Sequence, residues 1–242
     1  MGKHLPNAPI TEALLDIQVE LPPDITIESL RDVHDRIREQ YPTRRERIDF
    51  QARFDPGARS VSMEAVRNTG FFCRSADERQ VMQARIDGFA FSRLPPYDRW
   101  EGLRDEAKKL WQVYSEVAQP LRITRLALRY INRLELPQRA RLEDYVTTFP
   151  KLSEAYPQDV SGLFMRVVTD RGLDRVIISE ALEEQSADQH RMPLILDIDA
   201  FRTVDMPIQA EANAWTVLEE LRVLKNDVFF GSITARAEAL FQ

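Results

Sequence analysis

Cysteine and glycine are both scarce in this sequence. Its 242 residues contain one cysteine, Cys73, and eight glycines. A single cysteine excludes an internal disulfide and is typical of a protein from a reducing compartment. The glycines form no Gly-rich phosphate loop, and Cys and His residues show no zinc-site spacing. We therefore expect no nucleotide-binding loop, no structural zinc and no cofactor.

Long apolar runs and a strong charge of one sign are also missing. No run of about 18 apolar residues occurs, and the N-terminus has no apolar segment of signal-peptide length. We therefore expect a cytoplasmic protein that does not contact membranes. The 33 basic residues nearly offset the 39 acidic ones, for a net charge of −6. This balance argues against general nucleic-acid binding, which favours a strongly basic domain.

What the sequence does contain is a weak internal repeat at an offset of 115 residues. The segments IQVELP, residues 17–22, and NRLELP, residues 132–137, end in the same way. A constant offset kept over about 85 positions indicates an internal duplication. The same offset relates Glu28 to Glu143, Tyr41 to Tyr156, Pro42 to Pro157, Gly57 to Gly172, Trp100 to Trp215 and Leu103 to Leu218.

Each half predicts the same order of elements, from alternating apolar residues in strands and apolar residues three or four apart in helices. In the first half we expect a strand at 15–21, a helix at 27–41, a hairpin at 47–66, strands at 71–74, 80–86 and 89–93, and a closing helix whose capping box runs from Asp98 to Glu101. In the second half we expect a strand at 125–136, a weaker helix at 142–152, a hairpin at 163–182, a strand at 193–200, a closing helix from about 207 and a final helix after 226–227.

The predicted fold class is therefore α+β. Two tandem repeats, residues 1–119 and 120–242, each read strand, helix, antiparallel strands, helix. We expect them to pack as one compact unit, an intramolecular pseudo-dimer with a shared or facing pair of sheets and helices on the outer faces.

Five residues are expected to have structural roles. Gly57 and Gly172 lie where hairpin turns commonly need a positive φ. Trp100 and Trp215 lie on the inner faces of the closing helices. The parity of Asn132 places its amide among apolar side chains, where it must find hydrogen-bond partners. We expect this amide to hold the opening segment or the interface between the repeats.

A row of arginines marks one candidate binding site. Arg125, Arg129 and Arg133 share one face of their strand with Glu135. Planar guanidinium groups suit a phosphate or carboxylate ligand, because each binds two oxygens at once. The alternative is a solvated sheet face on which acids of neighbouring strands balance the arginines.

Asp197 and Asp199 are the candidates for those acids, since both project from one side of a strand. The same two carboxylates also make a candidate metal site, because hard oxygen ligands suit Mg²⁺. Carboxylates at this spacing are common in ordinary strands, so a structural role is the alternative.

Aromatic residues offer an apolar counterpart. Phe89 and Phe91 occur in the middle strands of the first half and have no close equivalents in the second. If they line the cleft between the halves, they form an apolar pocket with arginines at its mouth, which is the general form of a small-molecule site. The alternative is that they enlarge the core.

No catalytic residue is predicted. His4, His34 and His190 have no patterned Ser or Cys partner. Cys73 lies beside two phenylalanines, as expected of a small core residue.

Three motifs resemble those of a sporadically distributed, uncharacterised family of bacterial proteins of about this length. The motifs are Leu5-Pro6-Asn7-Ala8-Pro9-Ile10-x-Glu12-Ala13, Arg129-Tyr130-x-Asn132-Arg133, and Asn226-Asp227-x-Phe229-Phe230-x-x-Ile233-Thr234. The resemblance spans the whole chain. It implies no activity, cofactor or catalytic residue.

The sequence favours a non-catalytic module that binds a ligand or a protein in the groove between the two repeats. The partner would be a small anionic ligand or another protein, and a homodimer is compatible with the sequence. The alternative is a phosphate-handling or metal-dependent enzyme that uses the arginine row and the aspartate pair. A third alternative is a subunit of a protein complex, with an exposed apolar patch at VFFGSI, residues 228–233.

Overall fold

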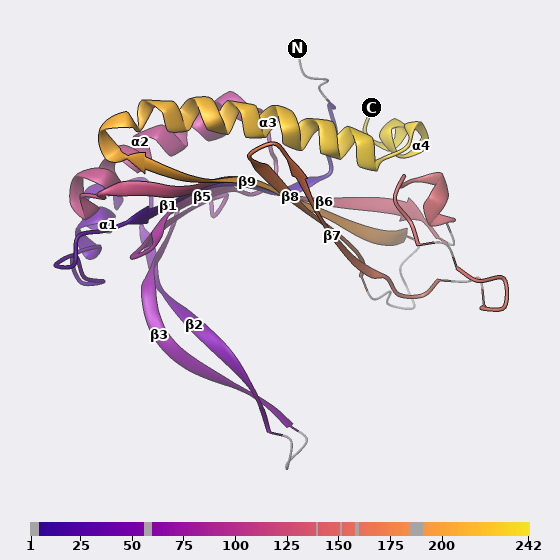
Figure 1. Cartoon of the computed structure of the whole chain (residues 1–242), viewed down its shortest axis with the longest axis horizontal. Coiled ribbons are helices and arrows are strands. Elements are labelled where there is room, and N and C mark those ends of the chain that lie inside the picture. The colour runs from indigo at the N-terminus through magenta and orange to yellow at the C-terminus, as the bar shows by residue number, and fades with distance from the viewer. Residues whose placement is uncertain (1–4, 56–59, 139, 151, 158–159, 184–190) are drawn as a thin grey trace.

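The fold is given by a computed structural model (Figure 1). It describes residues 5–55, 60–138, 140–150, 152–157, 160–183 and 191–242, and at 49–55 and 60–66 it describes the backbone. Strands and helices are both present, so the fold class is α+β, as predicted. Gly57 lies outside the described residues, as do His4 and His190.

Along the chain, consecutive strands form groups that helices or 3-10 turns separate. The strands are β1 (Ile10–Glu20), β2 (Thr43–Asp55), β3 (Ser60–Arg74), β4 (Gln80–Arg85), β5 (Gly88–Arg93), β6 (Arg122–Pro137), β7 (Phe164–Arg171), β8 (Asp174–Leu182) and β9 (Arg191–Pro207). The helices are α1 (Arg31–Ile37), α2 (Trp100–Ala118), α3 (Ala212–Ser232) and α4 (Ala235–Glu238), with 3-10 turns η1 (Leu142–Asp144), η2 (Ile208–Ala210) and η3 (Ala239–Phe241).

The strands form one antiparallel sheet of nine, in the order β2-β3-β4-β5-β1-β6-β9-β8-β7. The first strands of the two halves, β1 and β6, lie side by side in it, with Leu15 opposite Leu128. Residues 1–119 and 120–242 therefore share a single sheet, one of the two arrangements that the sequence left open.

Helices cover one face of this sheet. α2 and α3 lie next to each other across it (Figure 1), and α1 packs against α2. Leu15, Ile17, Leu126 and Leu128 are fully buried beneath them. The hairpin of β2 and β3 extends away from the sheet on the side opposite α3 (Figure 1). In the described part of the chain no helix covers that opposite face, so the expectation of helices on both outer faces is wrong.

Two helices differ in length from their predictions. α1 ends at Ile37, and only hydrogen-bonded turns precede it from Thr26. α3 runs without a break through Asn226 and Asp227, where a new helix was expected. The break is absent because Leu224 and Phe229 continue the buried stripe, so packing stabilises the helix across these polar residues.

Two further predictions about helix ends are wrong. The N-cap of α2 is Arg99, with no side-chain hydrogen bond at the cap, so Asp98 and Glu101 do not form a capping box. In the second half the helix expected at 142–152 shrinks to η1. Thr147 is instead bonded to the end of α3, through its N–H to the carbonyl of Ser232, which holds the chain in an extended path.

The hairpin turn at Gly172 has the predicted conformation. Gly172 has φ +61° and precedes Leu173 in a two-residue turn between the paired residues Arg171 and Asp174. Glycine is favoured at the first central position of such a turn because it adopts positive φ without strain.

The sequence offset of 115 residues relates β1 to β6, the hairpin of β2 and β3 to that of β7 and β8, and α2 to α3. Neighbouring strands alternate in direction. A twofold axis between β1 and β6 would therefore relate β5 to β9, β4 to β8 and β3 to β7, and would leave β2 without a counterpart. The matching of the two hairpins by their sequences is not reproduced by such an axis.

Candidate functional site

The arginine row of β6 lies on the sheet face away from the helices. Residues that alternate with it along β6 are buried against the helices, so Arg125, Arg129 and Arg133 project from the opposite face. Arg129 lies directly opposite Asp199 of β9, and Asp197 shares that face. The tertiary structure thus brings together the arginines and aspartates that the sequence singled out.

Each guanidinium in this row has a carboxylate partner. Arg125 binds Asp16 as well as Asp199, and Arg133 also donates to Glu135. Phosphate binding by the row would have to displace these carboxylates, so its geometry supports the balanced sheet face rather than a phosphate site. The distances are 3.0 Å from Arg125 Nη2 to Asp199 Oδ2, 2.6 Å from Arg129 Nη2 to Asp197 Oδ2, and 3.0 Å from Arg133 Nε to Glu183 Oε2.

The carboxylates of Asp197 and Asp199 are likewise bound to arginines. Asp197 accepts two hydrogen bonds from Arg129, through Nε and Nη2. Burial raises the pKa of Asp199 above its usual value, although the charges of Arg125 and Arg129 act in the opposite direction. Among the described residues, no group of three or more His, Cys, Asp or Glu side chains is arranged to hold a metal ion. Both carboxylates are bound to arginines, so a metal ion at Asp197 and Asp199 would have to displace these partners.

The ion pairs of this arginine row extend into the first half of the chain through Asp16 and Arg85. Arg85 Nη2 on β4 lies 2.7 Å from Asp16 Oδ2 on β1, and both side chains are only 9% exposed. β5 lies between these strands, and its residue beside Arg85 is Gly88. A methyl group at Gly88 would lie 3.0 Å from Arg85 Nη2, so the missing side chain leaves room for the guanidinium.

Phe89 and Phe91 do not line a pocket on this face. Both are fully buried on the helix side of β5, where Phe89 makes an edge contact with Trp111 of α2 at 5.8 Å between ring centroids. The arginines project from the other side of the sheet. The proposed combination of a phenylalanine pocket with arginines at its mouth is therefore wrong, and these two rings belong to the core.

A second polar cluster lies between α3 and β6. Lys225 Nζ lies 3.7 Å from the ring centroid of Tyr130 and donates to Asn226 Oδ1 at 2.6 Å. The hydroxyl groups of Tyr130 and Tyr97 are 2.9 Å apart. Burial lowers the pKa of Lys225 to about 7, with a further contribution from the charge of Arg222.

Asn132 is buried, as its parity predicted. Its Nδ2 donates to the carbonyl oxygen of Leu196 on β9 at 3.0 Å and to that of Tyr130 at 3.3 Å. The amide therefore ties β6 to β9 rather than to the opening segment. The backbone of Asn132 does pair with Ile10 of that segment.

Sequence reasoning missed the buried carboxylate of Glu180 on β8. Glu180 is fully buried, and neither of its oxygens has a hydrogen-bond partner among the described residues. Burial raises its pKa to about 7. Glu180 lies two and four positions after Ile178 and Val176, so its side chain points to the same face as theirs. This spacing could have placed it on the helix side of the sheet.

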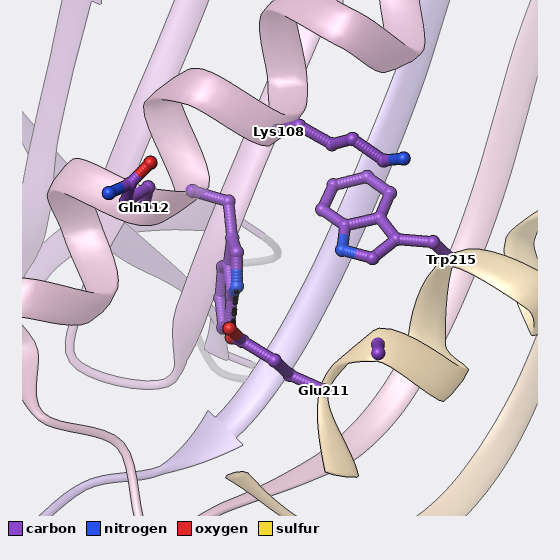
Figure 2. A pocket seen from close by; sticks show the side chains of 6 residues that line it. Lys108, Gln112, Glu211 and Trp215 are labelled. Atoms are coloured by element: carbon purple, nitrogen blue, oxygen red, sulfur yellow. Dashed lines mark hydrogen bonds between the residues drawn. The ribbon is translucent and has the colours of Figure 1, made fainter. Parts of the chain in front are cut away.

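The structure also shows a pocket that the sequence did not indicate. It measures about 390 Å³ and lies between α2 and the start of α3 (Figure 2). Lys108 and Gln112 come from α2, and Trp215 and Glu211 come from the other side (Figure 2). The pocket is lined by Lys108, Trp111, Gln112, Glu211, Ala212 and Trp215.

Polar contacts hold the two walls of this pocket together. Trp111 Nε1 donates to Glu211 Oε2 at 2.8 Å, and the Lys108 ammonium lies 5.1 Å from the centroid of the Trp215 ring. Farther along, Trp100 Nε1 donates to Glu219 Oε1 at 2.6 Å. The closing helices of the two halves are therefore joined by two indole–carboxylate hydrogen bonds.

The carboxylate of Glu219 accepts several hydrogen bonds in one of these contacts. Burial alone would raise its pKa, but hydrogen bonds from Trp100, Arg104 and Arg222 outweigh burial and hold the pKa below its usual value. Glu219 therefore stays ionised and fixes α3 against the first turn of α2. Trp100 is buried and Trp215 partly buried, as expected for the inner faces of these helices.

No protein-family model and no curated protein matches this chain. None of the helices in the described ranges combines the length and the apolar composition that a membrane crossing requires.

Proposed function

We propose that this protein is a non-catalytic binding module whose ligand site is the pocket between α2 and α3. The proposal rests on one observation: the closing helices of the two halves meet there and enclose a pocket of about 390 Å³. Small-molecule sites are concave and combine aromatic or apolar surface with a few polar groups. This pocket combines two indoles with three polar side chains, those of Lys108, Gln112 and Glu211.

The lining predicts the chemistry of the ligand. Trp111 and Trp215 provide aromatic surface, and Lys108 is the cation at the pocket. Glu211 is already engaged by the Trp111 indole. A planar apolar ligand with one anionic group would stack on Trp215 and place its charge beside Lys108.

We further propose that the two halves arose by duplication around an internal twofold axis. Three features support this proposal. β1 and β6 are adjacent and antiparallel, β5 pairs with β1 as β9 pairs with β6, and the closing helices α2 and α3 lie on one sheet face. The pocket would then lie at the interface between the repeats. β2 and α1 would be additions to, or losses from, one copy.

The test uses 8-anilinonaphthalene-1-sulfonate, an aromatic anion whose fluorescence rises in apolar sites. Wild-type protein should bind this probe, and Trp215→Ala and Lys108→Glu should each weaken binding by about tenfold, through lost stacking or reversed charge. Val223→Ala, an exposed position elsewhere on α3, is the matched control and should bind as wild type does. A panel of aromatic carboxylates and nucleoside phosphates is then screened for displacement of the probe.

Near-ultraviolet circular dichroism must show that each variant keeps its native packing. Probe fluorescence that is equal in wild type, Trp215→Ala and Lys108→Glu would refute the pocket as the ligand site.

A further inference from the structure

The two edges of the sheet are protected very differently. β2, at one edge, begins with the charged run Arg44-Arg45-Glu46-Arg47, and its pairing with β3 is interrupted by two register shifts. Charges and bulges of this kind prevent edge strands from pairing with other chains. β7, at the other edge, carries the charged residues Arg166, Asp170 and Arg171, but it has no lysine, no proline and no register shift in its pairing with β8.

The backbone of β7 presents its free hydrogen-bonding groups in a regular series. The N–H of Leu182 donates to the carbonyl of Leu163 at 3.0 Å, and the same register continues along β7. Bonded and non-bonded positions alternate in an antiparallel pair, so odd-numbered residues of β7 bond to β8. The groups that point to the outer edge belong to Phe164, Arg166, Val168 and Asp170, and no other strand of the described ranges pairs with them.

The same hairpin also carries exposed apolar side chains. Phe164 is 75% exposed, Val168 48% and Leu173, in the turn, 81%. By contrast, Phe229 of the VFFGSI segment is buried and Val228 packs against the core, so the exposed apolar surface expected there occurs on β7 instead. Exposed apolar side chains beside an unprotected edge mark a surface that is suited to strand pairing.

We propose that β7 is a homodimer interface, in which β7 of a second copy pairs antiparallel with it and the two sheets become continuous. The register that we infer places Val168 opposite Val168 of the second copy. Every free backbone group of β7 then faces another free group, because even-numbered residues face even-numbered residues.

Charge favours this register over those with the axis at Arg166 or Val167. With Val168 on the twofold axis, Arg166 of each copy lies opposite Asp170 of the other, so two ion pairs form across the interface. Asp170 also accepts a hydrogen bond from Arg175 Nε of its own copy at 2.7 Å, so in the dimer its carboxylate is shared between Arg175 and Arg166 of the second copy. A shift of the axis to Arg166 would place two guanidinium groups opposite each other. A shift of the axis to Val167 would place Phe164 opposite Asp170.

The inferred register also covers the exposed Phe164. Phe164 would lie opposite Gly172 of the second copy, where the absence of a side chain leaves open space around the backbone. Gly172 belongs to the turn that follows β7, so the ring would cover the turn backbone of the second copy. Leu173 is adjacent to that glycine and would contact the same ring.

The first experiment measures assembly by sedimentation velocity and light scattering over about a hundredfold range of concentration. Wild-type protein should dimerise as concentration rises, and Val168→Lys should be monomeric, since two ammonium groups would meet on the axis. Ile48→Lys is the matched control: Ile48 is 41% exposed on the protected edge strand β2, and this variant should dimerise as wild type does.

The second experiment exchanges the charges. Arg166→Asp alone and Asp170→Arg alone each create two like-charge pairs in a homodimer, so each should dissociate about tenfold more readily than wild type. An equimolar mixture of the two variants forms a heterodimer with both ion pairs restored, and its dissociation constant should return to the wild-type value.

Three results would overturn the proposal. They are wild-type protein that stays monomeric at every concentration, a dimer that Val168→Lys leaves intact, and charge variants whose mixture is no tighter than either variant alone. None of these results depends on the pocket between α2 and α3, so the dimer and the ligand site fail or stand separately.

Discussion

Asp16 and Arg85 form a buried ion pair across an intervening strand. The Asp16 carboxylate on β1 lies 2.7 Å from Arg85 Nη2 on β4, with β5 between them. Arg125 of β6 reaches the same carboxylate at 3.4 Å and Asp199 of β9 at 3.0 Å. One chain of alternating charges therefore ties strands of the first half to strands of the second.

Removing Asp16, the centre of this series of ion pairs, should destabilise the protein strongly. Asp16→Ala leaves the buried Arg85 guanidinium with only the exposed Asp87 carboxylate, at 2.9 Å from Nε. Loss of a buried partner costs up to about 3–5 kcal/mol, and the remaining pair with Asp87 should keep the loss below that limit. Urea unfolding should show this loss in the free energy of unfolding. Arg171→Ala removes an exposed ion pair with Asp227 and should cost less than about 1 kcal/mol. Equal losses in both variants would contradict a buried network.

Substitution of Gly88 should be far more costly than substitution of a helical glycine. Gly88 has φ +154°, and a methyl group there would meet the carbonyl of Ile17 and crowd Arg85. Gly88→Ala is therefore expected to lower the free energy of unfolding by more than about 2 kcal/mol. Gly231→Ala, in the last turn of α3, meets nothing within 4 Å and should be neutral or stabilising by up to about 1 kcal/mol. Thermal unfolding of the two variants decides the comparison.

The buried carboxylate of Glu180 should make stability fall as pH rises. Its pKa is raised from 4.5 to about 7 by burial, so the unfolded chain releases this proton first. Stability from this group is complete below pH 4.5 and is lost progressively as pH rises to about 7, by about 3 kcal/mol in all. Glu180→Gln does not titrate and should lack this decline. Unfolding curves with the same slope between pH 5 and pH 7 in both proteins would refute the assignment.

Lys225 should act in the opposite direction at higher pH. Burial lowers its pKa from 10.5 to about 7, so between these values the unfolded chain binds the proton and the folded chain does not. Stability from this group therefore rises with pH over that window. Lys225→Met keeps the length of the side chain and should abolish the rise. Melting temperatures at pH 7, 8, 9 and 10 for both proteins test the difference, and parallel curves would contradict it.

Much of the local structure could be predicted from residue patterns. Alternation along β1 and β6, the apolar stripe of α2 and the glycine turn at Gly172 each depend on neighbours in sequence. The lengths of α1 and α3 could not be predicted in this way. α3 continues through Asn226 and Asp227 because the sheet beneath it buries Leu224 and Phe229, and that surface comes from distant strands.

For the candidate site, the pattern showed which side chains share a face but not what that face meets. It placed Arg125 and Arg129 together and Asp197 and Asp199 together, correctly. It could not show that the two sets neutralise each other or that Phe89 lies on the opposite side of the sheet. Nor could it reveal the pocket beside Trp215, because its walls come from helices about a hundred residues apart.

The sequence by itself determined the α+β class and the inward or outward direction of most strand residues, because both follow from local periodicity and from a side-chain period of two. The order of the strands in the sheet was decided only by tertiary structure. That order places Asp16 beside Arg85, joins α2 to α3 and leaves β7 at an open edge, since hydrogen-bond pairing between distant strands is set by the packing of the whole core.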